Sequence, residues 1–417
     1  MKIAVIGAGI IGVTTAYELA LDGHEVTVFE RRIAAAEESS FATAGIIAPS
    51  YIAPWAAPGM PLKIVRHLFA KHAPVRFRLP LSGSDMAWMW KCWRSCTLDS
   101  YVRNRTRLQR LALYSRERLH EISADQELEY DRSSGHLVLL RSERDHVLMQ
   151  PGLQVLRDAD IAFRELGPEE ARKIELALNP DTALHSAIHL PGDEVGNCRQ
   201  FALLLKNVAL GKGVHFAFST QVEKIDPTNG MLLSIAGESA PRRFDTAVVC
   251  AGVDSVRLLS PLGLKIPLAA VHGYSVSAPV REAINAPRSA VMDEHYKVAI
   301  TRLGNRVRVA GSAEIGGQPD KQHNRALQTL YKILQDWFPG AAHLSNGVQV
   351  WKGARPMLPD GPPLLGASGI PGLWLNLGHG SSGWALSCGS ARAVADLIGG
   401  RDPGVDLEGF DIGRLQH

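Results

Sequence analysis

The sequence lacks three features, and each absence excludes a class of protein. It contains no uninterrupted apolar run of roughly 18 residues or more, so we predict no membrane-spanning helix. The formal net charge of the 417 residues is only +3, which argues against nucleic acid as a partner. The cysteines show no C-x-x-C spacing, which favours reduced thiols in a cytoplasmic protein over a disulfide framework. There are five of them: Cys92, Cys96, Cys198, Cys250 and Cys388.

Acidic residues are missing between Ser39 and Ser84. Basic side chains alternate there with apolar ones on a predicted helix, and tryptophans follow. The basic residues are Lys63, Arg66, Lys71, Arg76 and Arg78, the apolar ones Leu62, Ile64, Val65, Leu68 and Phe69, and the tryptophans Trp88, Trp90 and Trp93. Two interpretations stay open: residues 60–95 contact an anionic membrane surface, or the helix packs between domains with a solvated basic face.

The first thirty residues carry the clearest pattern. An apolar run, Lys2–Ile6, predicts a strand buried on both faces of a parallel sheet. Gly7-Ala8-Gly9-Ile10-Ile11-Gly12 follows and forms a complete G-x-G-x-x-G. The helix predicted over Val13–Leu21 would point its unpaired N–H groups at a phosphate. A second strand, Glu25–Phe29, completes the unit, which predicts a dinucleotide site. Because these first residues form a core strand, we expect no signal peptide.

The acid that ends the second predicted strand narrows the choice of nucleotide. Glu30 lies where a carboxylate can accept hydrogen bonds from ribose hydroxyls, and it would repel a 2′-phosphate. Arg31 and Arg32 beside it keep NADP open as an alternative. The motif alone does not separate FAD from NAD.

Three later segments have the composition of cofactor contacts. The loop Ser39–Ile47 is small and hydroxylated, the strand Phe244–Cys250 ends in Ala-Gly, and Gly378–Trp384 opens a second helix after the strand Leu373–Leu377. A plain surface loop and an ordinary helix cap at His379 are the alternatives. Beyond the N-terminal motif, Glu30 and Arg31, the candidate cofactor-binding residues are Ser40, Thr43, Ala44, Gly45, Ile46, Val222, Ala251, Gly252, Gly378, His379, Gly380, Ser381, Ser382, Gly383 and Trp384.

The middle of the chain predicts a second domain. Alternating strands at Ile266–Val276 and Ala290–Ala310 predict an antiparallel sheet. We therefore expect an α/β Rossmann-like domain formed by 1–50, 190–262 and 353–417, interleaved with an α+β substrate domain formed by 51–189 and 263–352. His185 and His189 have the spacing of metal ligands only on a helix. The sequence after them predicts strand and turn, so we predict no metal site.

Several motifs, in order along nearly the whole chain, resemble the D-amino acid dehydrogenase small-subunit family of the FAD-dependent D-amino acid oxidase superfamily. Besides the N-terminal glycines, they are the loop Pro54–Gly59, Gly273-Tyr274, the run Tyr296–Arg302, the segment Arg355–Gly361 and Gly378-His379-Gly380. The resemblance implies non-covalent FAD and oxidative deamination of D-amino acids to 2-oxo acids and ammonia, with hydride transfer from Cα to flavin N5. It further implies that electrons pass to a quinone or another acceptor at the inner face of the inner membrane.

The resemblance also implies the residues of the substrate site. Arg355 would bind the substrate carboxylate, with help from Tyr296, and a planar guanidinium suits a bidentate grip on a carboxylate. Tyr51 and Tyr274 are candidate pocket walls. Some relatives place a second arginine where this chain has Ser381 and Ser382, and an asparagine where it has Thr43.

Two alternatives to this function stay open. One is a flavoenzyme for glycine, sarcosine or a cyclic secondary amine such as proline or hydroxyproline. The other, from a different class, is a flavin-binding subunit without turnover. Arg355 and Tyr296 each retain a structural alternative, as a support for a proline-rich turn and as an ordinary strand aromatic.

Overall fold

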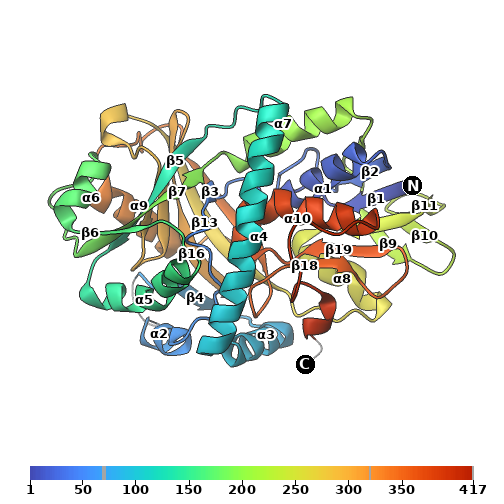
Figure 1. Ribbon diagram of the computed structural model, residues 1–417, viewed down its shortest axis with the longest axis horizontal. Helices are drawn as coiled ribbons and strands as arrows, with labels where there is room; N and C mark the ends of the chain where they lie inside the picture. The colour runs from blue at the N-terminus through green and yellow to red at the C-terminus, as the bar shows by residue number, and fades with distance from the viewer. Residues whose placement is uncertain (68–71, 319–320, 416–417) are drawn as a thin grey trace.

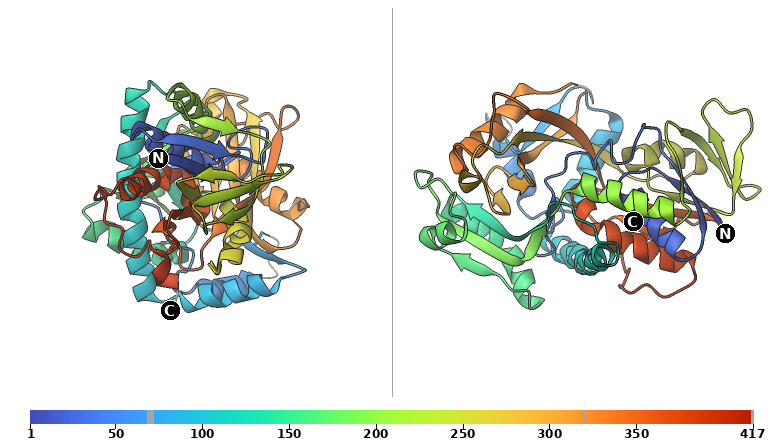
Figure 2. Two further views of the ribbon diagram at one scale, coloured as in Figure 1. Left: turned by 90° about the vertical axis from the view of Figure 1, so that its right-hand side faces the viewer. Right: turned by 90° about the horizontal axis from the view of Figure 1, so that it is seen from above.

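The computed structural model describes residues 1–67, 72–318 and 321–415, and its two main sheets lie in opposite halves of the molecule (Figures 1 and 2). The first is a mostly parallel sheet with the strand order β18-β19-β12-β1-β2-β8, in which β18 runs antiparallel. Its strands are β1 (Lys2–Ile6), β2 (Glu25–Phe29), β8 (His215–Ala217), β12 (Thr246–Val249), β18 (Leu364–Ala367) and β19 (Leu373–Leu377). Ile3 to Ile6 are buried, as expected for a strand covered on both faces.

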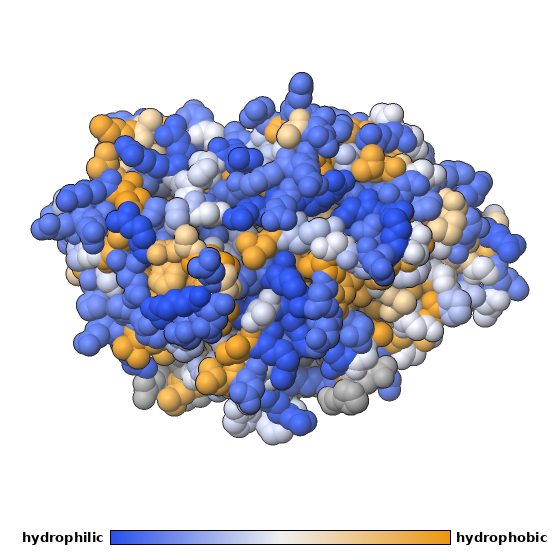
Figure 3. Space-filling view, in the orientation of Figure 1, coloured by the Kyte–Doolittle hydropathy of each residue, from blue (hydrophilic) through white to orange (hydrophobic). Residues whose placement is uncertain are grey.

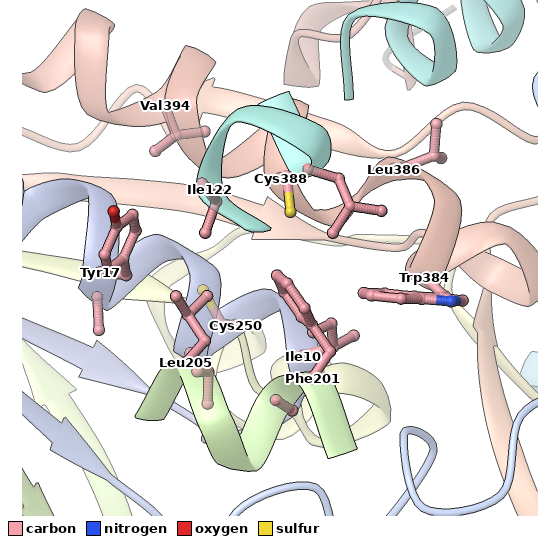
Figure 4. Close-up of a cluster of buried hydrophobic side chains, with 14 of the residues drawn as sticks. Ile10, Tyr17, Ile122, Phe201, Leu205, Cys250, Trp384, Leu386, Cys388 and Val394 are labelled. Atoms are coloured by element: carbon pink, nitrogen blue, oxygen red, sulfur yellow. The ribbon is translucent and has the colours of Figure 1, made fainter. Parts of the chain in front are cut away.

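Four helices pack against this sheet and one another: α1 (Ile10–Leu21), α4 (Leu98–Asp125), α7 (Cys198–Gly211) and α10 (Gly383–Ile398). Figure 4 shows their shared core, in which Tyr17, Phe201, Trp384 and Cys388 gather between the ribbons. A buried ion-pair network joins three of the helices, because Glu18 of α1 bonds Arg118 of α4 at 2.7 Å and Arg392 of α10 at 2.8 Å. These contacts fix the orientation of α1, the helix that follows the glycine motif.

The second sheet is larger and mostly antiparallel, with the order β17-β13-β16-β15-β14-β5-β7-β3; β4 pairs with β16, and β6 with β7. Its strands are β3 (Ile46–Ile47), β4 (Val75–Arg78), β5 (Ser133–Leu140), β6 (Arg164–Leu166), β7 (Ser186–Val195), β13 (Ala269–Pro279), β14 (Ala290–Asp293), β15 (Val298–Leu303), β16 (Arg306–Gly316) and β17 (Gln349–Met357). The helix α9 (Asn324–Trp337) packs against β13 and β16 through a continuous apolar face that includes Leu330, Ile333 and Trp337.

The remaining elements surround these two layers. They are α2 (Met60–His67), α3 (Gly83–Arg94), α5 (Glu143–Asp158), α6 (Pro168–Ile174), α8 (Ser255–Leu259) and the antiparallel strands β9 (Val222–Asp226), β10 (Met231–Ile235) and β11 (Arg242–Phe244). None of the helices in the described parts of the chain is both long and apolar enough to cross a membrane.

The packing of the elements divides the chain differently from the expected domain ranges at four places. Helix α4, expected in the substrate domain, packs its Leu111 and Leu119 into the core beside α10. The strands β3, β7 and β17 lie wholly or partly within ranges expected in the Rossmann-like domain, yet all three pair within the larger sheet. The expected boundaries at residues 190 and 353 fall inside β7 and β17, because composition does not mark where a strand begins or ends.

Candidate active site

One cavity of about 770 Å³ runs between the two sheets. Except for Ala8 and Gly12, every residue that we expected to contact the cofactor lines it. Arg355, Tyr51 and Tyr274 line it as well, whereas Tyr296 does not. The fold therefore brings the dinucleotide motif and the candidate carboxylate-binding arginine into one space. Cavities of this size are typical of ligand sites.

The glycine motif leaves no room for side chains at its tight turn. A Cβ on Gly7, whose φ is +106°, would lie 2.6 Å from the carbonyl oxygen of Cys250, and one on Gly12 would lie 1.8 Å from that of Gly7. Helix α1 has no side-chain cap at Gly9 and no acid in its first turn. Its positive end is therefore uncompensated toward the cavity, which fits a pyrophosphate.

The acid and the serine around this helix start are held in place by backbone donors. The carboxylate of Glu30 accepts from the N–H groups of Ala8 and Arg32, both at 2.8 Å, and it still lines the cavity. The hydroxyl of Ser40 accepts from the N–H of Ile10 at 3.0 Å. Arg31 pairs with Glu38, whose pKa lies below its usual range because of that arginine and Arg32. Both arginines that kept NADP open are thus paired with the one carboxylate of Glu38.

The second glycine-rich helix start faces the same cavity. Helix α10 has neither an acid in its first turn nor a side-chain cap, so it too presents uncompensated N–H groups. His379 is buried, its Nε2 donates to the hydroxyl of Ser390 at 3.0 Å, and burial lowers its pKa to about 3. His379 therefore stays neutral and fastens the loop to α10. The N-terminal ends of α1 and α10 and the carboxylate of Glu30 therefore line one cavity, and this arrangement fits a flavin dinucleotide.

Arg355 lines the cavity from the larger sheet, which we call its substrate end, whereas the glycine motif and α1 form its nucleotide end. Arg355 lies on β17 and rests on the backbone of β13. A Cβ on Gly273 would lie 2.2 Å from its Nη2, so only glycine leaves room for the guanidinium. Its Nη1 donates to the carbonyl of Ser312 at 2.9 Å. The β13–β16 ladder shifts register here, so Ser312 and Ala313 both oppose Gly273. Ser312, at φ +58°, therefore presents its carbonyl to the arginine.

The charge on Arg355 has no carboxylate partner within ion-pair distance among the residues that the structure describes. Burial lowers its pKa to about 10, so the side chain is still a cation at neutral pH. A desolvated cation that faces a cavity without a counterion is unfavourable until an anion binds. The geometry therefore suits a carboxylate, which a guanidinium can hold with two parallel hydrogen bonds.

The structure does not bring Tyr296 to this arginine. The run Tyr296–Arg302, which we expected to be strand throughout, begins in the turn between β14 and β15. The N–H of Tyr296 donates to Asp293, and its ring lies between the cations Arg141 and Lys332, at 5.2 and 5.7 Å. The turn directs the ring of Tyr296 toward Lys332 of α9, and Tyr296 does not line the cavity, so a substrate contact from Tyr296 stays a prediction that its position does not support.

Sequence reasoning missed a charged group that lines the cavity near this turn. Lys297, at φ +52°, forms an ion pair with Glu294, and the hydroxyl of Tyr51 donates to Glu294 at 2.5 Å and accepts from Lys297 at 3.2 Å. Burial and the neighbouring Glu294 raise the pKa of Tyr51. The hydroxyl of Tyr274 is likewise committed, since it donates to Glu314 at 3.1 Å. Charged residues in an ordinary turn carry no periodic signal that would have identified them.

Comparison with known proteins places this site in context. A family model described as "FAD dependent oxidoreductase" matches residues 2–397. A D-amino acid dehydrogenase of Bradyrhizobium diazoefficiens is 40% identical over 419 residues, which cover 100% of this chain and 99% of the relative. Glycine oxidase from Geobacillus kaustophilus has a similar structure, with a TM-score of 0.76 at 20% identity over 99% of this chain and 98% of that one. L-Proline dehydrogenase from P. horikoshii gives 0.75 at 17% identity, over 100% and 97%.

Proposed function

The chain belongs to the family of FAD-dependent oxidoreductases, and on that premise we propose that it is a dehydrogenase of D-amino acids. The product would be a 2-oxo acid and ammonia. The observation that carries the proposal is the guanidinium of Arg355, which lines the same cavity as the glycine motif and has no carboxylate partner within ion-pair distance in the described part of the chain. The identity to a D-amino acid dehydrogenase over the full chain supports the same substrate class.

FAD would be held by the residues that line the first part of the cavity, and when bound it supplies the acceptor for two electrons. Gly9, Ile10 and the start of α1 would face the pyrophosphate, and Glu30 the ribose. The loop 43–46 is held in place by the larger sheet, because Arg308 of β16 donates to the carbonyl of Thr43 at 2.9 Å. Gly378–Trp384 would meet the ring system at the second helix end.

Arg355 would act by positioning. Its guanidinium grips the substrate carboxylate, and this fixes the direction of the Cα–H bond relative to the cofactor. The substrate loses a hydride from Cα and a proton from its amine, which leaves an imine; water then adds and ammonia leaves. Ser312 keeps the guanidinium oriented through its carbonyl, so the grip is ready before the substrate enters.

The experiment that tests this function is anaerobic. The purified yellow holoprotein is mixed in turn with D-alanine, L-alanine, D-proline and glycine, and flavin absorbance is followed. We expect bleaching by D-alanine and none by L-alanine, slow recovery in air and fast recovery with a soluble quinone. Bleaching only by glycine or D-proline would move the substrate class to small or cyclic amines. No bleaching by any amino acid would favour a flavin-binding subunit without turnover.

The electron acceptor is proposed to be a membrane quinone, reached through a surface on α2 and α3. We call this the α2–α3 surface; its exposed apolar residues are Leu62 of α2 and Met86, Trp90 and Trp93 of α3, together with Leu79 and Leu98 from the chain segments before and after α3. Figure 3 shows apolar residues at the lower left edge, over α2 and α5. Trp90 and Trp93 are 57% and 59% exposed and meet edge to face, which suits a membrane interface, whereas Trp88 is core and bonds Met357.

The basic residues expected on this segment are described only in part, since residues 68–71 lie outside the described residues. On α3, Lys91 follows Trp90 and Arg94 follows Trp93. We expect the holoprotein to sediment with vesicles that contain anionic lipid and the double variant Trp90→Ser, Trp93→Ser to stay in solution. Equal sedimentation of both proteins would refute the surface, and neutral vesicles serve as the control.

A further inference from the structure

The floor of the substrate end consists of two glycines that face each other across β13 and β17. Gly273 and Gly353 are direct partners in this antiparallel ladder, so their missing side chains would point to the same face, about 5 Å apart. The guanidinium of Arg355 occupies the place above Gly273. Above Gly353, a Cβ would lie 1.7 Å from Cζ3 and 2.0 Å from Cη2 of Trp351. The indole and the guanidinium therefore lie side by side.

Trp351 is held rigidly at this position. Its ring stacks on Phe41 with centroids 5.9 Å apart and planes inclined by 17°. Phe41 is covered in turn by the guanidinium of Arg199, 4.2 Å from its centroid, and Arg199 pairs with Glu37. Trp351 nevertheless lines the cavity. A fixed indole with a free surface beside a carboxylate-binding cation is a preorganised apolar contact.

We propose that Trp351 determines substrate specificity by packing against the side chain of the amino acid. The inference rests on the proposed function, since it places the carboxylate on Arg355. A group attached to Cα lies only two or three bonds from that carboxylate, so it can reach an indole that covers Gly353, the direct ladder partner of the glycine beneath the guanidinium. An aromatic or branched apolar side chain gains by leaving water there, whereas a charged one loses hydration. The preferred substrates are therefore D-amino acids with flat or branched apolar side chains.

The test compares two substrates in two variants. The values of kcat/KM for D-phenylalanine and D-alanine are measured with a soluble acceptor for the wild type, Trp351→Ala and Trp351→Phe. We expect Trp351→Ala to lower the value for D-phenylalanine about 30-fold and that for D-alanine at most about 3-fold, because the methyl group of alanine has little surface to lose. Trp351→Phe keeps an aromatic face and should restore most of the preference.

A binding measurement separates substrate contact from folding and from chemistry. Benzoate and acetate carry the same carboxylate with and without a ring, and each is titrated into the oxidised holoprotein while the flavin absorption band is followed. We expect Trp351→Ala to weaken benzoate about tenfold and to leave acetate unchanged. Equal losses for both acids or for both substrates, or loss of flavin from the variant, would overturn the specificity role. If no D-amino acid is oxidised by the wild type, the proposed function fails instead, and the two acids still decide the role of Trp351.

Discussion

The two ends of the cavity are built in opposite ways. At the nucleotide end, Gly7 to Glu30 belong to one continuous β1-α1-β2 unit, and backbone N–H groups and one carboxylate would meet the ligand. At the substrate end, Arg355, Gly273 and Ser312 come from three different strands, and one guanidinium would meet the ligand. A site made from backbone groups is therefore specified locally by the sequence, whereas a site made from one cation depends on the register of a whole sheet.

The largest effect is expected when the cation at the substrate end is removed. We expect Arg355→Ala to lower kcat/KM for D-amino acids about 1,000-fold, roughly 4 kcal/mol, because the buried carboxylate of the substrate would lose its partner. FAD should stay bound, since the nucleotide end is untouched. Steady-state kinetics and the flavin-to-protein ratio after gel filtration measure the two ends separately. An unchanged apparent affinity for the substrate would contradict the role of Arg355.

This division also explains how much the sequence could predict. The motif around Gly9, the strands β1, β2, β12 and β19 of the parallel sheet and the helix after Gly378 were predicted, because each is a local pattern in the sequence. Arg355 was inferred by resemblance. The way in which Gly273 and Ser312 hold its guanidinium was not predicted, because the register shift opposite Gly273 is a property of paired strands. Tyr296 was misplaced for a related reason: a strand pattern does not reveal where a hairpin turns.

At the nucleotide end, a single added methyl group is expected to weaken the binding of FAD. In Gly12→Ala the new Cβ would lie 1.8 Å from the carbonyl oxygen of Gly7, so α1 must move away from the loop. We expect FAD affinity to fall about 100-fold, a loss of roughly 2.7 kcal/mol, because the helix end no longer points at the pyrophosphate. Fluorescence titration of apoprotein with FAD gives the value. Gly211→Ala, with no atom within 4 Å of the added Cβ, is the matched control. Equal affinity in both variants would refute the explanation.

Gly273→Ala tests the position of the guanidinium of Arg355 separately from its charge, because it displaces the side chain without removing it. The added Cβ would lie within 2.8 Å of three guanidinium atoms, so the side chain must leave its seat while its charge remains. We expect KM for D-alanine to rise about 30-fold with FAD affinity unchanged, since a misplaced guanidinium keeps its attraction but loses the bidentate geometry. A rise as large as that for Arg355→Ala would mean that the arginine is displaced entirely, and no rise would mean that the seat is not needed.

The smallest effect concerns the histidine that fastens the second helix end. Burial holds the pKa of His379 at about 3, below the value of 6.5 expected in the unfolded chain. As the pH falls below 6.5, the unfolded state binds a proton at His379 and the folded state does not, so the free energy of unfolding decreases. Between pH 6.5 and 5.5 the wild type should lose about 1 kcal/mol more than His379→Gln, which has no proton to gain. Chemical unfolding of both proteins at saturating FAD measures the difference. Identical slopes would show that His379 is not the group that titrates, and that the loop before α10 is held by packing alone.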